Sequence, residues 1–477
     1  MPDKITYEVL AMKNLNNNQD IILNGSIIKS VLVLAGPIMI NNMVQAVYNL
    51  TDTFFVSQLG SLPMAAMTLA WPVVYFFLAI GIGMNIAGTS LIAQYIGDGR
   101  KEEARQVSGE LISISFILSL IMGLIAAVFT PHIISFMGGE GEVLRHGVIF
   151  LRIMMVGMPG LFLFLAYSAI LQGQGDTFTP MKLKLVSLVL NIVLDPLLIF
   201  GLNFGIAGAA IATIFSRGIF ALYGLKTLTD YSPDRIQIRL ADLKPGTKML
   251  KLFKVALPNC IGQSMEAFGF IFLNMFIIAY GNETIAAFGI GNRISSFTLM
   301  PAMGIGTALA TVVGQNLGAD QILRARKAVK LSALISALLL GATGLAFFNF
   351  IPTLTGFFTG EEVVYNQTVD YLQLIILTLP LMGFFQVFIG TFQGSGHTVY
   401  AMIMMVGRLW LMRIPLIIFF RTYTDLGPTG VWYAMILSNL FVSLLGLAIY
   451  FARTWESKVI RDEKQVQKAP GKEYITK

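Results

Sequence analysis

Long apolar stretches fill most of this 477-residue chain, and short polar segments separate them. Each stretch is close to or above the ~20 residues that a helix needs to cross a bilayer. The pattern predicts an all-α polytopic membrane protein with twelve transmembrane helices. The predicted spans are about 27–56, 63–95, 104–130, 147–171, 180–200, 206–228, 248–279, 284–316, 327–351, 367–392, 399–421 and 428–452.

The two halves of the chain repeat one unit at a nearly constant spacing of 221 residues. Internal repeats are typical of secondary transporters, whose binding sites lie between the repeated units. Six spans per unit place both units in the membrane in the same orientation, so we expect two pseudo-symmetric six-helix lobes. Matching pairs include Pro37 and Pro258, Gly60 and Gly281, Gly83 and Gly304, Gln94 and Gln315, and Gly175 and Gly396.

The boundaries of these lobes follow from the spans. We expect an N-lobe at 27–228 (helices 1–6) and a C-lobe at 248–452 (helices 7–12). A linker at 229–247 contains Pro, Gly and mixed charge, so it is predicted to be cytoplasmic. Polar tails at 1–26 and 453–477 complete the chain, and the first is too polar for a cleavable signal peptide.

Composition and charge narrow the class further. The chain is 55% apolar and 12% charged, against about 25% charged in soluble domains, which excludes a soluble fold. The net charge of +7 does not indicate nucleic acid, because the basic residues gather on one side. Seven lie between spans six and seven and seven in the C-terminal tail, whereas the opposite loops hold only Arg145 and Arg421. The positive-inside rule therefore predicts cytoplasmic termini in a cytoplasmic (inner) membrane, with contacts to membrane lipids.

The first span carries a polar stripe. Asn41, Gln45, Asn49 and Asp52 are spaced by four, four and three residues, so they share one helical face. We interpret the first three as support for the acidic residue at the end of the stripe.

Polar residues in spans five and six lie at the same depth as Asp52. At about 1.5 Å per residue, Asp52 and Thr213 are roughly 12 Å, and Asp195 roughly 9 Å, from the nearest loop, and Asn191 is one turn deeper. A carboxylate near the bilayer centre costs about 2.5–3.5 kcal/mol, so a buried pair requires a reason. These four residues are predicted to bind a coupling cation or proton. The alternative is that the two acids only cap helix ends at the interface.

The second unit provides an internal control. Its equivalents of the four polar residues are apolar, so the scaffold was copied without this polar cluster. A purely structural cluster would be useful twice, and the asymmetry therefore favours function. Asp52 corresponds to Leu273 and Thr213 to about Met435. With Pro196 aligned to Pro415, Asn191 and Asp195 correspond to Trp410 and Ile414; the plain spacing of 221 gives Met412 and Leu416, which are also apolar.

The C-lobe has polar candidates of its own. Gln263 and Glu266 lie on one face of span seven, and Arg293 lies in span eight. They form either a cargo-binding site or a structural ion pair between Glu266 and Arg293.

Pro37 and Pro258 lie inside their spans, where each bends its helix and acts either as scaffold or as a hinge for alternating access.

Three segments resemble the multidrug and toxic compound extrusion (MATE) family, most closely its DinF-like branch. They are residues 47–56, residues 172–177, and Asn191-x-x-x-Asp195-Pro196. The resemblance implies two lobes around a central cleft and export of cationic, amphipathic organic compounds in exchange for Na⁺ or H⁺. It also implies that Asp52, Asn191, Asp195 and Thr213 bind the coupling ion. We expect no cofactor, no metal beyond Na⁺, and a monomer.

Other classes of function fit less well. The chain has no phosphate-binding loop of a primary pump, and its three histidines lie in or beside loops without metal spacing, so we expect no enzyme. The remaining rival is a flippase for lipid-linked saccharides or lipids with a related two-lobe fold, whose cleft should be lined by basic residues. The N-lobe acids argue against it, whereas four arginines keep it open: Arg217, Arg293, Arg408 and Arg413.

Overall fold

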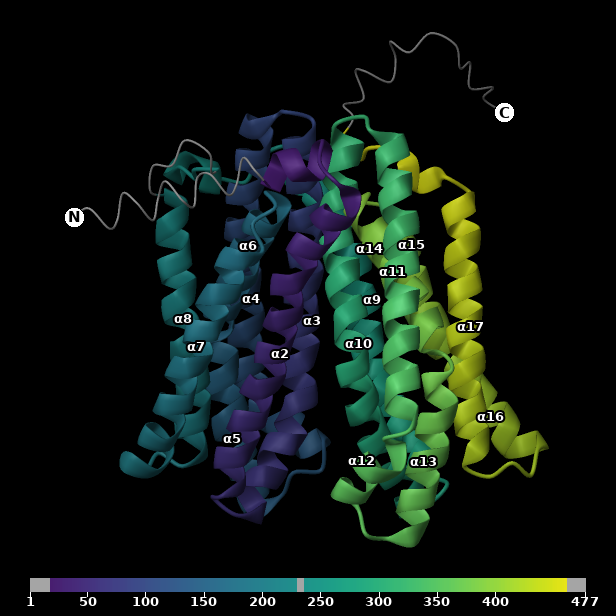
Figure 1. Cartoon of the computed structure of the whole chain (residues 1–477). Helices are drawn as coiled ribbons and strands as arrows, with labels where there is room; N and C mark the ends of the chain where they lie inside the picture. Colours follow the sequence, from purple (N-terminus) through teal and green to yellow (C-terminus); the bar gives the residue numbers. More distant parts are fainter. Residues whose placement is uncertain (1–17, 230–235, 461–477) are drawn as a thin grey trace, which may run out of the picture.

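The computed structural model describes residues 18–229 and 236–460 (Figure 1). Within these ranges the chain forms helices and connections, with no strand. The predicted tails and linker fall partly outside the described residues, so their full extent stays a prediction. Residues 18–23, inside the predicted N-terminal tail, are helical.

Two helical bundles stand side by side (Figure 1). We call the first of them, α2 to α8, the N-lobe. Its helices are α2 (Ile27–Ser57), α3 (Ser61–Gly97), α4 (Lys101–Phe136), α5 (Gly141–Val156), α6 (Met158–Gly173), α7 (Phe178–Pro196), the π-helix η1 (Leu197–Gly201) and α8 (Ile206–Thr229).

The second bundle, the C-lobe, follows after the short 3₁₀ helix η2 (Leu240–Leu243). Its helices are α9 (Met249–Ile278), α10 (Asn282–Gly318), α11 (Ile322–Phe348), α12 (Ile351–Phe358), α13 (Glu362–Ile376), α14 (Leu379–Gly394), α15 (Thr398–Val406), the π-helix η3 (Gly407–Arg413), α16 (Ile414–Tyr423) and α17 (Thr429–Phe451); the 3₁₀ turn η4 (Thr454–Glu456) follows.

The predicted number of spans is confirmed. Ten described helical segments are long and apolar enough to cross a membrane, and two bent pairs bring the number to twelve. The pairs are α5–α6, bent by 44°, and α13–α14, bent by 56°. Pro159 and Pro380 lie at the start of α6 and α14, where a missing backbone donor favours a break. By contrast, α2 and α9 run unbroken through Pro37 and Pro258.

The two lobes meet in a close-packed seam between α2, α3, α9 and α10. A Cβ on Gly97 would overlap the carbonyl oxygen of Gln315, and a Cβ on Gly318 would overlap that of Gln94. These two contacts are equivalent in the repeat, because each residue has its counterpart 221 positions away. Glycine at both positions therefore lets the backbones of α3 and α10 approach closely.

Side-chain hydrogen bonds across the seam repeat in the same way. Gln94 donates to the carbonyl of Gly394 at 3.1 Å, and Gln315 donates to the carbonyl of Gly173 at 2.9 Å. These bonds lie at the end of the molecule where α2 begins and α17 ends, at the top of Figure 1. We call this end the terminal side and the opposite end the far side.

Chain segments outside the spans also join the two lobes on the terminal side. The Lys458 ammonium, which follows α17, lies 2.8 Å from Asp98 of the N-lobe and 2.7 Å from Asp320 of the C-lobe. Arg324 of α11 donates to the carbonyls of Ile22 and Gly25, which precede α2. The lobes are thus held together on the side from which their chains enter the bundle.

Candidate cation-coupling site in the N-lobe

The structure brings the four predicted polar residues together where α2, α7 and α8 meet. Asn191 and Asp195 have no exposed surface, and Asp52 and Thr213 are only 5% and 4% exposed. The spacing of Asn191 and Asp195 places both on the buried face of α7, one turn apart. Asp195 directly precedes Pro196, and the helix then widens into the π-helix η1. Such π-turns occur frequently at functional sites.

Hydrogen bonds and direct contacts link these side chains across the three helices. Thr213 donates its hydroxyl to Asp52 Oδ2 at 3.3 Å, and Asn191 donates its amide to Asp195 Oδ1 at 3.3 Å. The carboxyl groups of Asp52 and Asp195 also interact with each other, and Asn191 interacts with Asp52. The four residues therefore form one cluster.

The cluster leaves three buried oxygens without a hydrogen-bond partner: Asp52 Oδ1, Asn191 Oδ1 and Asp195 Oδ2. Unpaired buried oxygens are costly, and two carboxylates side by side repel each other unless a proton or a cation lies between them. The donor set of carboxylate, amide and hydroxyl oxygens suits a hard cation such as Na⁺. The described residues contain no cluster of three His, Cys, Asp or Glu for a metal.

The rest of the predicted stripe on α2 lies apart from this cluster. Gln45 donates to Asn49 at 2.9 Å, so these two residues bond to each other. The carbonyl of Asn41 accepts a bond from Lys184 at 3.2 Å, and its side-chain oxygen is buried without a partner. The stripe therefore extends toward the terminal side and makes no hydrogen bond to either acid.

Three neighbours of the cluster were missed by the sequence reasoning. Tyr48 lies one turn before Asp52, and its hydroxyl bonds to Ser216. The Arg217 guanidinium lies 4.3 Å from the centre of the Tyr48 ring, in cation–π geometry, and acts electrostatically on Asp52. Helical spacing supplied the signal, because Tyr48 and Arg217 lie four residues from Asp52 and Thr213.

The C-lobe arranges its polar groups differently. Glu266 of α9 pairs with Arg408 of η3, and not with Arg293, whose side chain is exposed. The predicted Glu266–Arg293 pair is therefore wrong. The side chain that reaches Glu266 comes from the π-helix, a local irregularity that the sequence does not reveal. Gln263 is half-buried on the same helix.

Both buried arginines of η3 have partners. The Arg408 guanidinium also lies 4.6 Å from the centre of the Phe385 ring. Arg413 donates to Ser438 at 3.0 Å and to Asn439 at 2.8 Å. Glu266 is thus already neutralised by an internal cation, so the C-lobe has no counterpart of the N-lobe carboxylate pair.

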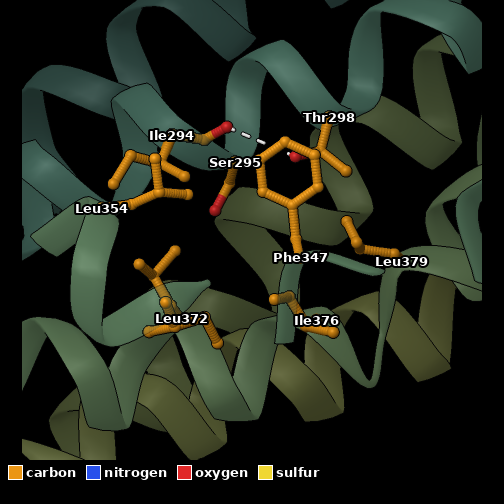
Figure 2. Close-up of a pocket in the computed structure, with 9 residues that line it drawn as sticks. Ile294, Ser295, Thr298, Phe347, Leu354, Leu372, Ile376 and Leu379 are labelled. Carbon is orange, nitrogen blue, oxygen red and sulfur yellow. Dashed lines mark hydrogen bonds between the residues drawn. The ribbon is translucent and has the colours of Figure 1, made fainter. Parts of the chain in front are cut away.

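A small cavity in the C-lobe does not add a second site. It lies between α10, α11, α12, α13 and α14 and is lined mainly by apolar side chains (Figure 2). Thr298 donates to the carbonyl of Ile294, and Ser295 to that of Gly291, so their hydroxyls are satisfied within α10. Its volume of about 10 Å³ is near the minimum for one water molecule.

Two repeated helical lobes, a membrane-embedded polar cluster and a close-packed seam define the class of multi-pass membrane transporters. The family model MatE matches the chain twice, at residues 37–197 and 258–419. The chain belongs to the MATE family of multidrug efflux transporters, whose members are not enzymes. The two matched segments coincide with the repeated units of the sequence.

Similar proteins cover nearly the whole chain. It is 28% identical over 456 residues to a probable multidrug resistance protein NorM of Thermotoga maritima, covering 92% of this chain and 95% of the relative. It is 26% identical over 444 residues to a probable multidrug resistance protein YoeA of Bacillus subtilis, covering 91% and 96%. A solved transporter of the MOP superfamily from Pyrococcus furiosus superposes with a TM-score of 0.86 at 28% identity, covering 91% of this chain and 97% of that one.

Proposed function

We propose that this transporter exports cationic, amphipathic organic compounds in exchange for Na⁺ or H⁺, and that Asp52, Asn191, Asp195 and Thr213 bind the coupling ion. The single observation that carries this proposal is the buried pair of carboxyl groups, found in one lobe only, in which each acid keeps one oxygen without a hydrogen-bond partner. The multidrug names of the relatives support a drug-like cargo, and the acidic cluster supports the DinF-like branch.

The proposed orientation follows from charge. Basic residues gather at the terminal side, which we therefore place in the cytoplasm, with the chain in the cytoplasmic membrane. The far side, nearer to Asp52 and Asp195, then faces outward. A membrane potential of 100 mV contributes about 2.3 kcal/mol for each positive charge that moves inward.

Alternating access supplies the link between ion and cargo. A cation between Asp52 and Asp195 removes their mutual repulsion and draws α2 and α7 together at this level. This change favours one arrangement of the lobes over the other, as any ligand with unequal affinity for two states does. Pro37 and Pro258, inside unbroken helices, are the proposed hinges.

The N-lobe acids also weigh against the rival flippase. A lipid-linked pyrophosphate requires basic side chains that are free to bind it, whereas Arg408 is paired with Glu266 and Arg217 lies beside the two N-lobe acids, where a second anion would be repelled. Glu266 is therefore proposed as structural support of the C-lobe and not as the acid that binds cargo. We expect the transporter to act as a monomer within membrane lipids.

Dye transport in proteoliposomes tests the proposal. Wild type is compared with Asp52→Asn and Asp195→Asn under an imposed Na⁺ gradient and, separately, an imposed pH gradient. Each variant keeps the shape of the side chain and loses its charge, so we expect gradient-driven transport to fall close to background. Normal transport by both variants under both gradients would refute the coupling role.

A further inference from the structure

Arg217 and Tyr48 form a layer directly beside the proposed cation site. Arg217 lies four residues after Thr213 on α8, and Tyr48 lies four residues before Asp52 on α2. Because α2 and α8 run in opposite directions, both steps lead toward the terminal side. The layer therefore lies about 6 Å from the carboxylates on that side.

The guanidinium is held in this layer without a carboxylate partner. It lies 4.3 Å from the centre of the Tyr48 ring, and the Tyr48 hydroxyl is fixed in turn by Ser216. Among the described residues Arg217 makes no ion pair, and one of its terminal nitrogens is buried without a hydrogen-bond partner. Its charge attracts the carboxylate of Asp52, but Asp52 Oδ1 still has no hydrogen-bond partner.

A second basic side chain lies farther toward the terminal side. Lys184 of α7 donates to the carbonyl of Asn41 at 3.2 Å and interacts electrostatically with Arg217. It precedes Asp195 by eleven residues, or about 16 Å along the helix. Two basic side chains thus lie in sequence between the acids and the terminal side.

We propose that Arg217, with Lys184 behind it, is a positive barrier that stops the coupling cation from passing through the N-lobe into the cytoplasm. This inference rests on the proposed function. An exchanger transports cargo only if its coupling ion cannot leak across by itself. Fixed basic groups repel cations along such a path, as they do in selective channels.

The repeat shows how the two lobes place basic groups at this level. Arg217 corresponds to Ser438 or Asn439 of the C-lobe, and Lys184 corresponds to Met405. These C-lobe positions are uncharged in the sequence, but the guanidinium of Arg413 reaches both Ser438 and Asn439 from η3. Charged groups inside a membrane are costly, and Arg217, unlike Arg408, makes no ion pair among the described residues, which indicates a role other than neutralising one acid.

Passive ion flux measures the barrier directly. Purified transporter in sealed liposomes, without cargo, is given an inward-negative potential, and Na⁺ and H⁺ entry are recorded separately. We expect Arg217→Gln to leak about tenfold faster than wild type, equivalent to about 1.4 kcal/mol of barrier. Arg217→Lys keeps the charge and should stay sealed. Lys182→Gln removes an exposed cation from the same helix α7 and should also stay sealed.

A second pair of variants covers the case in which Arg217→Gln does not fold, which size-exclusion chromatography reveals. Tyr48→Leu removes the ring beneath the guanidinium and should leak, whereas Tyr48→Phe keeps the ring and should stay sealed. Leak rates at the wild-type level for Arg217→Gln and Tyr48→Leu, or equal leaks for Arg217→Lys and Arg217→Gln, would overturn the barrier. The assay involves no exchange, so failure of the coupling proposal would appear separately, in the transport of Asp52→Asn and Asp195→Asn.

Discussion

The seam between the lobes and the buried polar sites within them follow opposite rules. At the seam, each lobe contributes the same contacts, with Gly97 against Gln315 and Gly318 against Gln94. In the bilayer-embedded cores the lobes differ: the N-lobe has two neighbouring acids with open oxygens, whereas the C-lobe has one acid paired with Arg408. Symmetry is kept where the lobes must fit together, and it is lost where the chemistry is placed.

The difference indicates which parts of the duplicated unit serve structure and which serve coupling. A contact needed for packing recurs in both units, because each lobe must present the same surface to the other. A site that couples one ion to one cargo is needed once.

The largest effect is expected at the symmetric seam. Gly97→Ala and Gly318→Ala would each place a Cβ onto a backbone carbonyl that cannot move aside, and each should cost about 3 kcal/mol. Thermal unfolding in detergent measures this loss. Gly289→Ala on α10, where a Cβ meets no atom within 4 Å, is the control. A clear difference between the two seam variants would argue against a symmetric seam.

The next effect concerns the C-lobe ion pair. Arg408→Gln leaves Glu266 without its cation in a partly buried position, and we expect a cost of about 2 kcal/mol. Glu266→Gln together with Arg408→Gln should recover about half of that loss, because the unpaired charge is removed. Unfolding of both single variants and the double variant forms a double-mutant cycle. Strictly additive losses would show that the pair contributes nothing.

A change of opposite sign is expected in the N-lobe. Asp52→Asn removes one of two neighbouring like charges while keeping the Thr213 hydrogen bond possible, so stability should rise by about 1 kcal/mol. Transport should be lost at the same time. The combination of higher unfolding temperature and no transport distinguishes a functional site from a structural one. A marked loss of stability would indicate that Asp52 serves packing.

The smallest effect is expected on the terminal side. Lys458→Gln removes the ammonium that lies between Asp98 and Asp320, both of which retain contact with solvent. Pairs of this kind contribute about 0.2–1 kcal/mol, so the shift should be small and should shrink further in high salt. Lys101→Gln, an exposed change on α4 at the same end, provides the baseline. A loss above about 2 kcal/mol would contradict this expectation and show that Lys458 contributes more than a solvent-exposed ion pair.

Much of this arrangement could be predicted from the sequence. Apolar stretches gave the twelve spans, and helix rise placed Asp52, Asn191, Asp195 and Thr213 at one depth, where the structure brings them together. The depth of a residue in the membrane depends only on its distance along the helix from the nearest loop. It could therefore be predicted without knowing how the helices pack. Their role as the coupling site stays a prediction.

Contacts between particular side chains could not be predicted from the sequence, because they depend on how each helix is rotated about its axis. Glu266 pairs with Arg408, which lies at the start of the π-helix η3, and this pairing depends on how α9 and η3 are rotated toward each other. Arg293, expected to be the partner, is exposed on α10. The contact between Arg217 and the Tyr48 ring likewise depends on how α2 and α8 pack. The four-residue spacing of Arg217 from Thr213 and of Tyr48 from Asp52 indicates only that both lie near the cluster.

Ion-dependent stability tests most directly whether the coupling ion binds in the N-lobe alone. A ligand at a hundred times its dissociation constant stabilises the folded state by about 2.7 kcal/mol. Unfolding temperature is measured with Na⁺ against choline at constant ionic strength, and at pH 8 against pH 6, for wild type, Asp195→Asn and Glu266→Gln. We predict that wild type and Glu266→Gln gain stability with one of these ions and that Asp195→Asn does not. The same gain in Asp195→Asn, or its loss in Glu266→Gln, would contradict the account.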